Sequence, residues 1–370
     1  MNPISGLFDE RNPRLHVTIR RKLAAAVSLS LDNQASSLTS LAGSNVMLSI
    51  GNITFGNRFG FLDEGEAKQG IMKSISSYLK YASRVGIFPE WHQTLFRLFI
   101  KSKKLNGLAH VQSFGKENLE ARSNESALKY KRVNTPGLTD FVSKFQQICT
   151  TDSSKISKDE IALACSISIG AGSDTTSISL SAIIYYLTLY PETMRKLRNE
   201  IKDMATQNLL SNPITFQESC SMPYLQAVIK EALRLHPVTG LILGRVVPKG
   251  GAMLSGIWFP EGSVVGVNLW VGHLKKEIFG SDADGFHPER WLGDPEVVRR
   301  RESYFMTFGM GSRTCIGKNI SIMELSKVVP ELVRAFDFVP ESGIPQWATE
   351  DVWFVKPRGY RCRIKLRDEV

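Results

Sequence analysis

The sequence predicts a mainly α-helical protein with small β-sheets, folded as one domain over residues 1–370. Three observations lead to this prediction. Residues 161–190 form a long apolar stretch, typical of a buried helix, with Asp174 as its only formal charge. Val, Ile, Gly and Pro alternate over residues 238–272, which indicates short strands and turns. The chain contains no internal repeat and no low-complexity linker that would separate two domains.

Residues 12–30 predict a basic amphipathic helix. Asn12-Pro13 can start it, and four apolar residues fall on one face. The opposite face is basic and carries His16, Arg20, Arg21 and Lys22. A basic face that only contacts water would explain this segment on its own, so its role depends on the rest of the sequence.

Helices separated by polar segments are expected over the following hundred residues. Residues 33–56 are rich in Ser and Asn, and residues 56–60 predict a turn. Residues 66–145 predict helices with a polar loop at 113–136, because that stretch mixes charges of both signs without clear periodicity.

The apolar stretch at 161–190 is long enough to span a bilayer. It also carries many Ser and Thr hydroxyls, together with Gly170 and Gly172. That is too polar for a helix that faces lipid, so a helix buried in protein is favoured. The Asp174-Thr175 pair at its centre interrupts the apolar pattern and requires an explanation.

The C-terminal half combines further helices with short strands. Helices are expected over residues 191–202, 222–235 and 316–336. Residues 279–314 are rich in turn formers, and residues 351–367 alternate as terminal strands do.

Composition and charge exclude several classes of protein. With 42% hydrophobic and 22% charged residues, the chain is neither disordered nor fibrous. A formal charge of +10 suits an acidic protein surface, a membrane face or nucleic acid. Nucleic acid is disfavoured, because the basic residues are scattered and no binding module occurs. Five cysteines without zinc-site spacing indicate a reducing compartment, and no signal peptide or N-terminal anchor is visible.

A single cysteine lies in a glycine-rich loop just before the helix expected at 316–336. Phe308, Gly311, Arg313, Cys315 and Gly317 follow the pattern F-x-x-G-x-R-x-C-x-G. Glycines let the backbone pass close to a flat ligand, and a helix N-terminus favours the thiolate form of a cysteine. A thiolate is a good soft ligand for iron. A buried structural cysteine is the alternative, and this combination of residues disfavours it.

The loop resembles the haem-binding loop of the cytochrome P-450 family, the haem-thiolate monooxygenases. Three more family motifs occur in the family's order. Residues 171–176 resemble the oxygen-activating segment, residues 231–234 match E-x-x-R, and residues 286–291 are similar to the P-E-R-F/W element. The resemblance covers nearly the whole chain from about residue 10 onward. Residues 244–248 and 317–321 resemble filamentous-fungal members of the pisatin-demethylase-like group.

The resemblance implies both the fold and the cofactor. The fold would be the cytochrome P-450 fold, lacking the N-terminal anchor and part of the N-terminal sheet region. The cofactor would be heme b, with an axial thiolate from Cys315 and a cradle formed by Phe308, Gly311 and Gly317. Its propionates would contact Arg20, Arg245 and Arg313, together with His16, which stands where the family has an aromatic residue.

Asp174 and Thr175 would be the catalytic residues by the same resemblance. A carboxylate beside a hydroxyl can relay two protons to dioxygen and so promote cleavage of its O–O bond. A threonine in a helix can instead bond back to a carbonyl one turn earlier, and the sequence leaves this alternative open. Substrate contacts are expected from apolar residues in the helix and in segments 238–243 and 347–354, namely Ala171, Val238, Leu241, Leu243 and Trp353.

A charged network is expected to hold the cysteine loop in place. Glu231 and Arg234 are three residues apart on one helix and therefore share a face. Alone they would form a surface ion pair of little energetic value. With Arg290 from a separate loop, the three charges can form a buried network, as the resemblance implies.

The expected function is insertion of one oxygen atom of O2 into a small apolar molecule, in fungal secondary-metabolite biosynthesis. Two alternatives stay open: an inactive, haem-poor remnant of such an enzyme, and a haem-thiolate isomerase or dehydratase. Electrons would come from an NADPH-cytochrome reductase. It would dock on basic residues near Cys315, among them Arg21, Lys22, Arg299, Arg300, Arg301 and Lys318.

By the same resemblance, family members begin with a membrane anchor, a hinge and further helices before the basic helix. This portion is expected to be missing here, and residues 30–53 are expected to be shorter than the family pattern. The family's location is the endoplasmic reticulum membrane, on its cytosolic face. A chain that is truly this short would be cytoplasmic.

Overall fold

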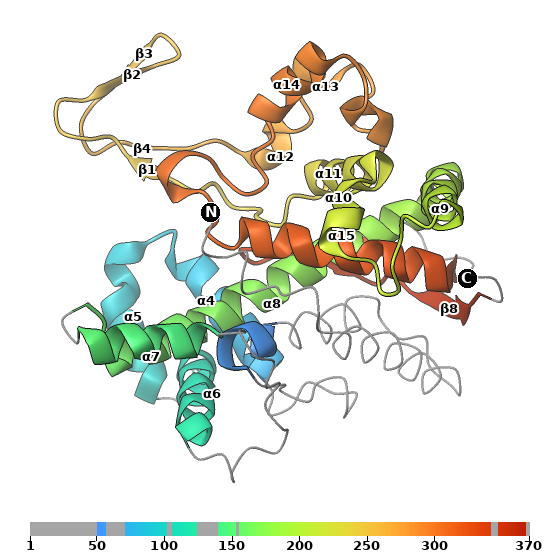
Figure 1. Cartoon of the computed structure of the whole chain (residues 1–370). Helices are drawn as coiled ribbons and strands as arrows, with labels where there is room; N and C mark the ends of the chain where they lie inside the picture. Colours follow the sequence, from blue (N-terminus) through green and yellow to red (C-terminus); the bar gives the residue numbers. More distant parts are fainter. Residues whose placement is uncertain are drawn as a thin grey trace.

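The computed structural model describes residues 50–56, 71–101, 106–123, 140–152, 155–341 and 347–367. The expected basic helix at 12–30 lies outside these residues, together with His16, Arg20, Arg21 and Lys22. The described part is mainly helical with small antiparallel sheets (Figure 1), which confirms the predicted fold class.

Twelve α-helices lie wholly within the described residues, and ten of them are longer than four residues. In chain order the first are α4 (Ile71–Val85), α5 (His92–Lys101), α6 (Asn106–Ser123), α7 (Phe141–Thr151), α8 (Lys158–Leu189) and α9 (Pro191–Thr206). They are followed by α10 (Phe216–Cys220), α11 (Pro223–Leu235), α14 (Pro295–Ser303) and α15 (Lys318–Ala335). Two four-residue helices, α12 (Leu269–Gly272) and α13 (Lys276–Phe279), and the 3-10 turns η3 (Pro89–Trp91), η5 (Pro288–Trp291) and η6 (Gly311–Arg313) complete the set.

Helix α8 is the central element and is buried, as the sequence predicts. It begins at a capping box in which Ser157 and Glu160 satisfy each other's backbone amides. It contacts α6, α7, α9, α11 and α15 along its 32 residues, and Figure 1 shows it crossing the molecule between these helices. Within the described ranges, no helix is long and apolar enough to cross a membrane.

Two apolar clusters pack against opposite ends of α8. The larger cluster joins its C-terminal half to α9, α11, α15 and the strands that follow α15. The smaller cluster joins its N-terminal half to α6, α7 and the helical residues 50–55. The centre of α8, where Asp174 and Thr175 lie, is therefore fixed from both sides.

The strands form four two-stranded antiparallel sheets. They are β1 (Arg245–Val246) with β4 (Val264–Val265), β2 (Ala252–Leu254) with β3 (Ile257–Phe259), β5 (Phe336–Pro340) with β8 (Cys362–Leu366), and β6 (Ala348–Asp351) with β7 (Val355–Arg358). Their registers pair Arg245 with Val265, Phe336 with Leu366 and Ala348 with Arg358. The strands predicted within 238–272 and 351–367 are confirmed.

Two helices differ from the sequence-based expectation. The loop predicted at 113–136 is wrong for its first part, because α6 continues to Ser123. Among the α6 side chains that the structure describes, Phe114 is the one large buried residue, so these side chains show no wide apolar stripe. Helix α14 lies in the supposedly turn-rich region and buries no residue. Its start is marked instead by Asp294, directly before Pro295, which accepts hydrogen bonds from the backbone amides of Glu296 and Val297.

Candidate active site

The Cys315 loop is a compact turn that presents a free thiol at the surface. Cys315 is exposed and lies between η6 and the start of α15. Its backbone amide donates to the Phe308 carbonyl at 2.8 Å, which closes the loop. Gly309 and Gly311 both adopt φ near +70°, where a residue with a side chain would be strained. The backbone thus requires the glycine of the sequence pattern at Gly311, whereas Gly317 has an ordinary φ of −81°.

The two guanidinium groups of Arg313 and Arg245 have no carboxylate partner among the described residues. Arg313 ends η6 and is exposed, and no interaction of its side chain is recorded in the described ranges. Arg245 begins β1 and donates only to the carbonyls of Leu243 and Gly244, at 3.0 Å each. Both groups can therefore accept an anionic ligand without first breaking an ion pair.

One stripe of α8 stays exposed although most of the helix is buried. Leu163, Ile167, Ala171 and Thr175 recur every four residues, and Leu163 and Ile167 are 48% and 58% exposed. Next to the stripe, the Thr176 hydroxyl bonds Ser321 of α15 at 3.0 Å, six residues after Cys315. This contact holds the centre of α8 beside the first turns of the helix that follows the cysteine loop.

Asp174 and Thr175 are neighbours in sequence but bond in different directions. The Thr175 hydroxyl donates to the Ala171 carbonyl at 2.9 Å, which is the local alternative left open by the sequence. The Asp174 carboxylate accepts a hydrogen bond from Lys356 of β7 at 2.6 Å. Sequence reasoning missed Lys356, because nothing in its local pattern points to a residue 182 positions earlier.

The two segments expected to contact substrate lie side by side. Val355 donates its amide to the Val238 carbonyl at 2.8 Å, and Gly240 donates to the Trp353 carbonyl at 3.2 Å. Thr239 and Phe354 form an isolated antiparallel bridge. Of the side chains, Leu241 and Leu243 are about two-fifths exposed, whereas Val238 is buried. Trp353 is partly exposed and has a φ of 97°.

The structure brings Glu231, Arg234 and Arg290 together in a fully desolvated network. Arg234 donates two hydrogen bonds to Glu231, at 2.9 and 2.7 Å, and Arg290 donates a third at 3.1 Å. The other two donors to this carboxylate are the Trp291 indole at 2.9 Å and the His287 amide at 3.1 Å. Trp291 was missed, although it follows Arg290 directly in the 3-10 turn η5.

His273 connects this network to the cysteine loop. The amide of Met306 donates to Nε2 of His273 at 2.9 Å, so Nε2 must be an acceptor. Nδ1 then carries the proton and donates to the Arg234 carbonyl at 3.0 Å. The ring is neutral in this arrangement, and burial lowers the pKa of His273 to about 4. A lone histidine in a turn-rich segment gave no signal of this role.

Stability is expected to fall as the pH drops from about 6.5 to about 4. Burial also lowers the pKa of His236 to about 4, so both rings stay neutral in the fold but become protonated when the chain unfolds. The unfolded state therefore binds more protons in this window. Urea unfolding should show a loss of about 2–3 kcal/mol for each histidine between pH 7.5 and 4.5. His273→Gln should flatten the slope, and equal slopes in both proteins would contradict the assignment.

Part of the basic surface expected to receive a reductase has another role. Arg301 donates to the Arg290 carbonyl at 2.6 Å and to the Ile278 carbonyl at 3.4 Å, so it braces the network. The expectation that Arg301 contributes to docking stays a prediction. Arg299 pairs with Glu296 at 2.9 Å, whereas Arg300 and Lys318 are exposed without an ion pair in the described part of the chain.

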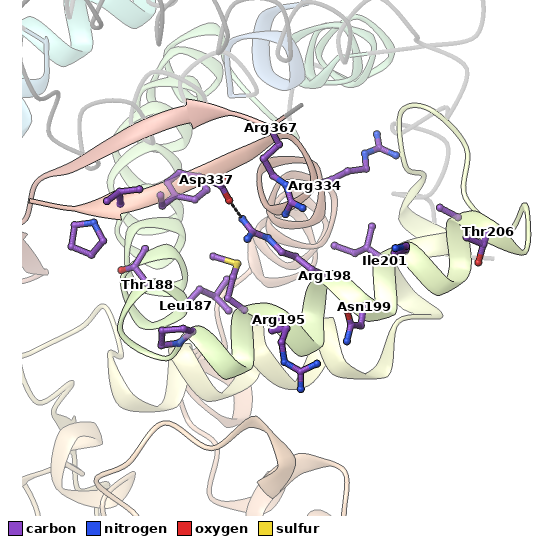
Figure 2. Close-up of a pocket in the computed structure, with 17 residues that line it drawn as sticks. Leu187, Thr188, Arg195, Arg198, Asn199, Ile201, Thr206, Arg334, Asp337 and Arg367 are labelled. Carbon is purple, nitrogen blue, oxygen red and sulfur yellow. Dashed lines mark hydrogen bonds and ion pairs between the residues drawn. The ribbon is translucent and has the colours of Figure 1, made fainter. Parts of the chain in front are cut away.

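A large cavity lies elsewhere on the molecule and contains none of the candidate residues. Its volume is about 1110 Å³, and its walls come from α8, α9, the end of α15 and β5. Figure 2 shows Arg198 pointing to Asp337 across it, at 2.7 Å. Arg334 lines the cavity from the last turn of α15, about 24 Å along that helix from its start beside Cys315.

A family model and individual relatives all relate this chain to the same protein family. The family model described as cytochrome P450 matches residues 16–362. A pisatin demethylase of Fusarium vanettenii is 37% identical over 98% of this chain and 73% of its own length. A second pisatin demethylase of the same fungus is 41% identical over 86% of this chain and 61% of its own length. Cytochrome P450 monooxygenase pkfB of Emericella nidulans is 34% identical over 86% of this chain and 61% of its own length. The chain thus spans about three-fifths to three-quarters of these relatives.

Proposed function

Because the chain belongs to the cytochrome P450 family, we propose that it is a haem-thiolate monooxygenase, or the catalytic portion of one. It would insert one oxygen atom of O2 into a small apolar organic molecule of fungal secondary metabolism. The observation that carries the proposal is the exposed Cys315 thiol, held in a glycine loop directly before α15, the helix that contacts α8 through Ser321 and Thr176. On the exposed stripe of α8, Leu163 and Ile167 offer large apolar side chains that suit a large, flat, apolar ligand.

The residues present fit a haem. Cys315 would supply the axial thiolate to heme b, with Phe308, Gly311 and Gly317 forming the cradle. A Cβ atom added at Gly317 would lie 3.8 Å from the Cys315 sulfur, while one at Gly311 would meet nothing within 4 Å. Arg245 and Arg313, together with Arg20 and His16, would bind the propionates. When bound, the haem supplies the chemistry that activates O2, with electrons delivered one at a time.

The chain's own residues would bind substrate and move protons. Accessible side chains for substrate contact come from Ala171, Leu241, Leu243 and Trp353. Val238 is buried and would contribute apolar packing beneath them. Their apolar character supports a substrate bound mainly by burial. Asp174 and Thr175 would deliver protons toward the face of α8 that carries the exposed stripe.

Thr175→Ala is expected to leave haem binding intact but to raise the hydrogen peroxide released per NADPH. The hydroxyl bonds only its own helix in this structure, so its loss should cost little stability. Without it, proton delivery fails and reduced oxygen escapes as peroxide. Stoichiometry of NADPH, O2 and peroxide in the mutant and in Thr175→Ser would check this. Identical peroxide release in the parent and Thr175→Ala would mean that the hydroxyl serves the helix alone.

The electron donor would be an NADPH-cytochrome reductase at the cytosolic face of the endoplasmic reticulum membrane. Arg300 and Lys318 are exposed, and Lys318 lies over the Phe308 ring with its ammonium 5.9 Å from the ring centre. Opposite charge on the reductase would raise the association rate at this surface. Docking here would bring the reductase close to the cysteine loop.

Charge reversal at Arg300 and Lys318 should slow reduction by the reductase. The difference from the parent should shrink as salt rises, because the screening length is about 10 Å at 0.1 M ionic strength. Arg195→Glu combined with Lys202→Glu on the distant helix α9 makes the same change of charge and should have no effect. Dithionite needs no docking and should reduce all variants equally. If the double charge-reversal variant is reduced by the reductase as fast as the parent across a salt series, this surface is not the docking site.

The proposed function is tested by the fate of oxygen. Purified protein supplied with haem, reductase and NADPH should convert members of a panel of small apolar molecules under 18O2. Each product should gain one labelled oxygen atom. Conversion without label would indicate an isomerase or dehydratase instead. A chain that binds no haem would be a remnant without this activity.

A further inference from the structure

A buried ion pair joins the centre of α8 to strand β7. The Lys356 ammonium lies 2.6 Å from the Asp174 carboxylate, and these side chains are only 12% and 4% exposed. Removing both charges from water costs several kcal/mol, so a buried pair is no default source of stability. A pair at this place therefore requires a reason beyond packing.

Lys356 belongs to the hairpin that carries a proposed substrate contact. It lies three residues after Trp353, whose φ of 97° marks the tight turn between β6 and β7. The neighbouring Val355 is bonded through its amide to Val238. The hairpin and the segment that follows α11 thus form one unit, and Lys356 connects that unit to the centre of α8.

The same pair decides where the Asp174 carboxylate lies. It is held toward β7, while the adjacent Thr175 hydroxyl is directed to the Ala171 carbonyl. The carboxylate and the hydroxyl are therefore engaged in separate hydrogen bonds rather than bonded to each other. Any proton that passes through both must begin from the position that Lys356 gives to Asp174.

We propose that Lys356 is a positioning residue for proton delivery, which holds the Asp174 carboxylate in place and couples it to the hairpin carrying Trp353. This inference rests on the proposed function. It predicts that removal of the ammonium changes how reduced oxygen is divided between hydrogen peroxide and water. Peroxide needs two electrons and two protons per O2, and two molecules of water need four of each, all electrons coming from NADPH.

The first test needs no haem and measures coupling between the two side chains. Thermal unfolding is compared for the parent, Lys356→Met, Asp174→Asn and the double variant. Lys356→Met should lower the midpoint by about 5 °C, because it leaves a buried carboxylate without its partner. In the Asp174→Asn background the same change should cost much less. Arg358→Met, which removes an exposed ion pair with Glu350 from the same strand, is the matched control and should shift the midpoint little.

The second test separates positioning from a purely structural role. In haem-loaded protein with reductase and no substrate, Lys356→Met should raise peroxide per NADPH about twofold or more. Lys356→Arg should restore the parent ratio, and Arg358→Met should not change it. The proposal would be overturned if the midpoint shifts of the Lys356 and Asp174 variants are coupled but the peroxide released per NADPH is unchanged. It would also be overturned if the two midpoint shifts are simply additive. If the parent itself binds no haem, the proposed function has failed. That outcome differs from a parent that binds haem and a Lys356→Met variant with the same peroxide release as the parent, which would overturn this proposal alone.

Discussion

Replacing Glu231 with Gln is expected to remove most of the folded protein, although the change is nearly isosteric. The Glu231 side chain is fully buried and accepts hydrogen bonds from Arg234, Arg290, Trp291 and the His287 amide. A glutamine offers one acceptor oxygen and turns an NH2 group toward buried donors. Arg234 then loses its countercharge, while Arg290 keeps its ion pair with Asp282 at 3.0 Å. Breaking a buried pair in this way costs about 3–5 kcal/mol, a large fraction of the 5–15 kcal/mol that stabilises most domains.

A nearby exposed carboxylate provides the control. Glu289 pairs with Lys196 at 2.6 Å and accepts from Tyr224 at 3.0 Å, but it is 47% exposed. Glu289→Gln should therefore change the free energy of unfolding by less than about 1 kcal/mol. Soluble yield, urea unfolding and haem content of the two variants give the comparison. If Glu231→Gln is as stable as Glu289→Gln, the Glu231 network does not stabilise the Cys315 loop.

The network explains how a distant charge cluster can control the cysteine loop. Thr307 donates its hydroxyl to the Leu233 carbonyl at 2.9 Å, next to the helix position of Arg234. Met306 is held through His273, which bonds the Arg234 carbonyl. Both residues lie at the start of the loop that ends at Cys315. Loss of the network should thus release the loop as well as destabilise α11.

Much of the fold could be predicted because α8, α9, α11 and α15 carry strong apolar patterns or clear starts. The N-terminal half of the described chain was less predictable. Helix α6 exposes most of the side chains that are described, and α14 buries none, so periodicity carried no signal for either. Strand β5 also follows α15 without a turn, since Phe336 caps the helix and begins the strand.

The candidate site was predictable where short motifs fix local geometry. The Cys315 loop and the contact of Glu231 with Arg234 depend on residues only three to seven positions apart. Lys356 and His273 could not be found in this way. Each acts through a partner from another element, Lys356 on Asp174 and His273 on Met306, and only the folded arrangement defines those contacts.

Cys315→Ser is expected to abolish thiolate ligation while leaving the fold of the chain unchanged. The Cys315 side chain is exposed, and the loop is closed by its backbone amide, which serine retains. The unfolding midpoint without haem should therefore match that of the parent. A serine hydroxyl is a hard, weakly acidic ligand and cannot replace a thiolate at haem iron. Cys220→Ser is the control, because Cys220 is also an exposed free cysteine but lies at the end of α10.

The central claim is that this chain holds haem iron through the Cys315 thiolate. The most direct test is the absorption spectrum of the reduced, carbon-monoxide-bound protein after loading with haem. The parent and Cys220→Ser should both show the band diagnostic of thiolate ligation, and Cys315→Ser should lack it. A thiolate band that persists in Cys315→Ser, or a parent that binds haem without ever showing the band, would contradict the claim.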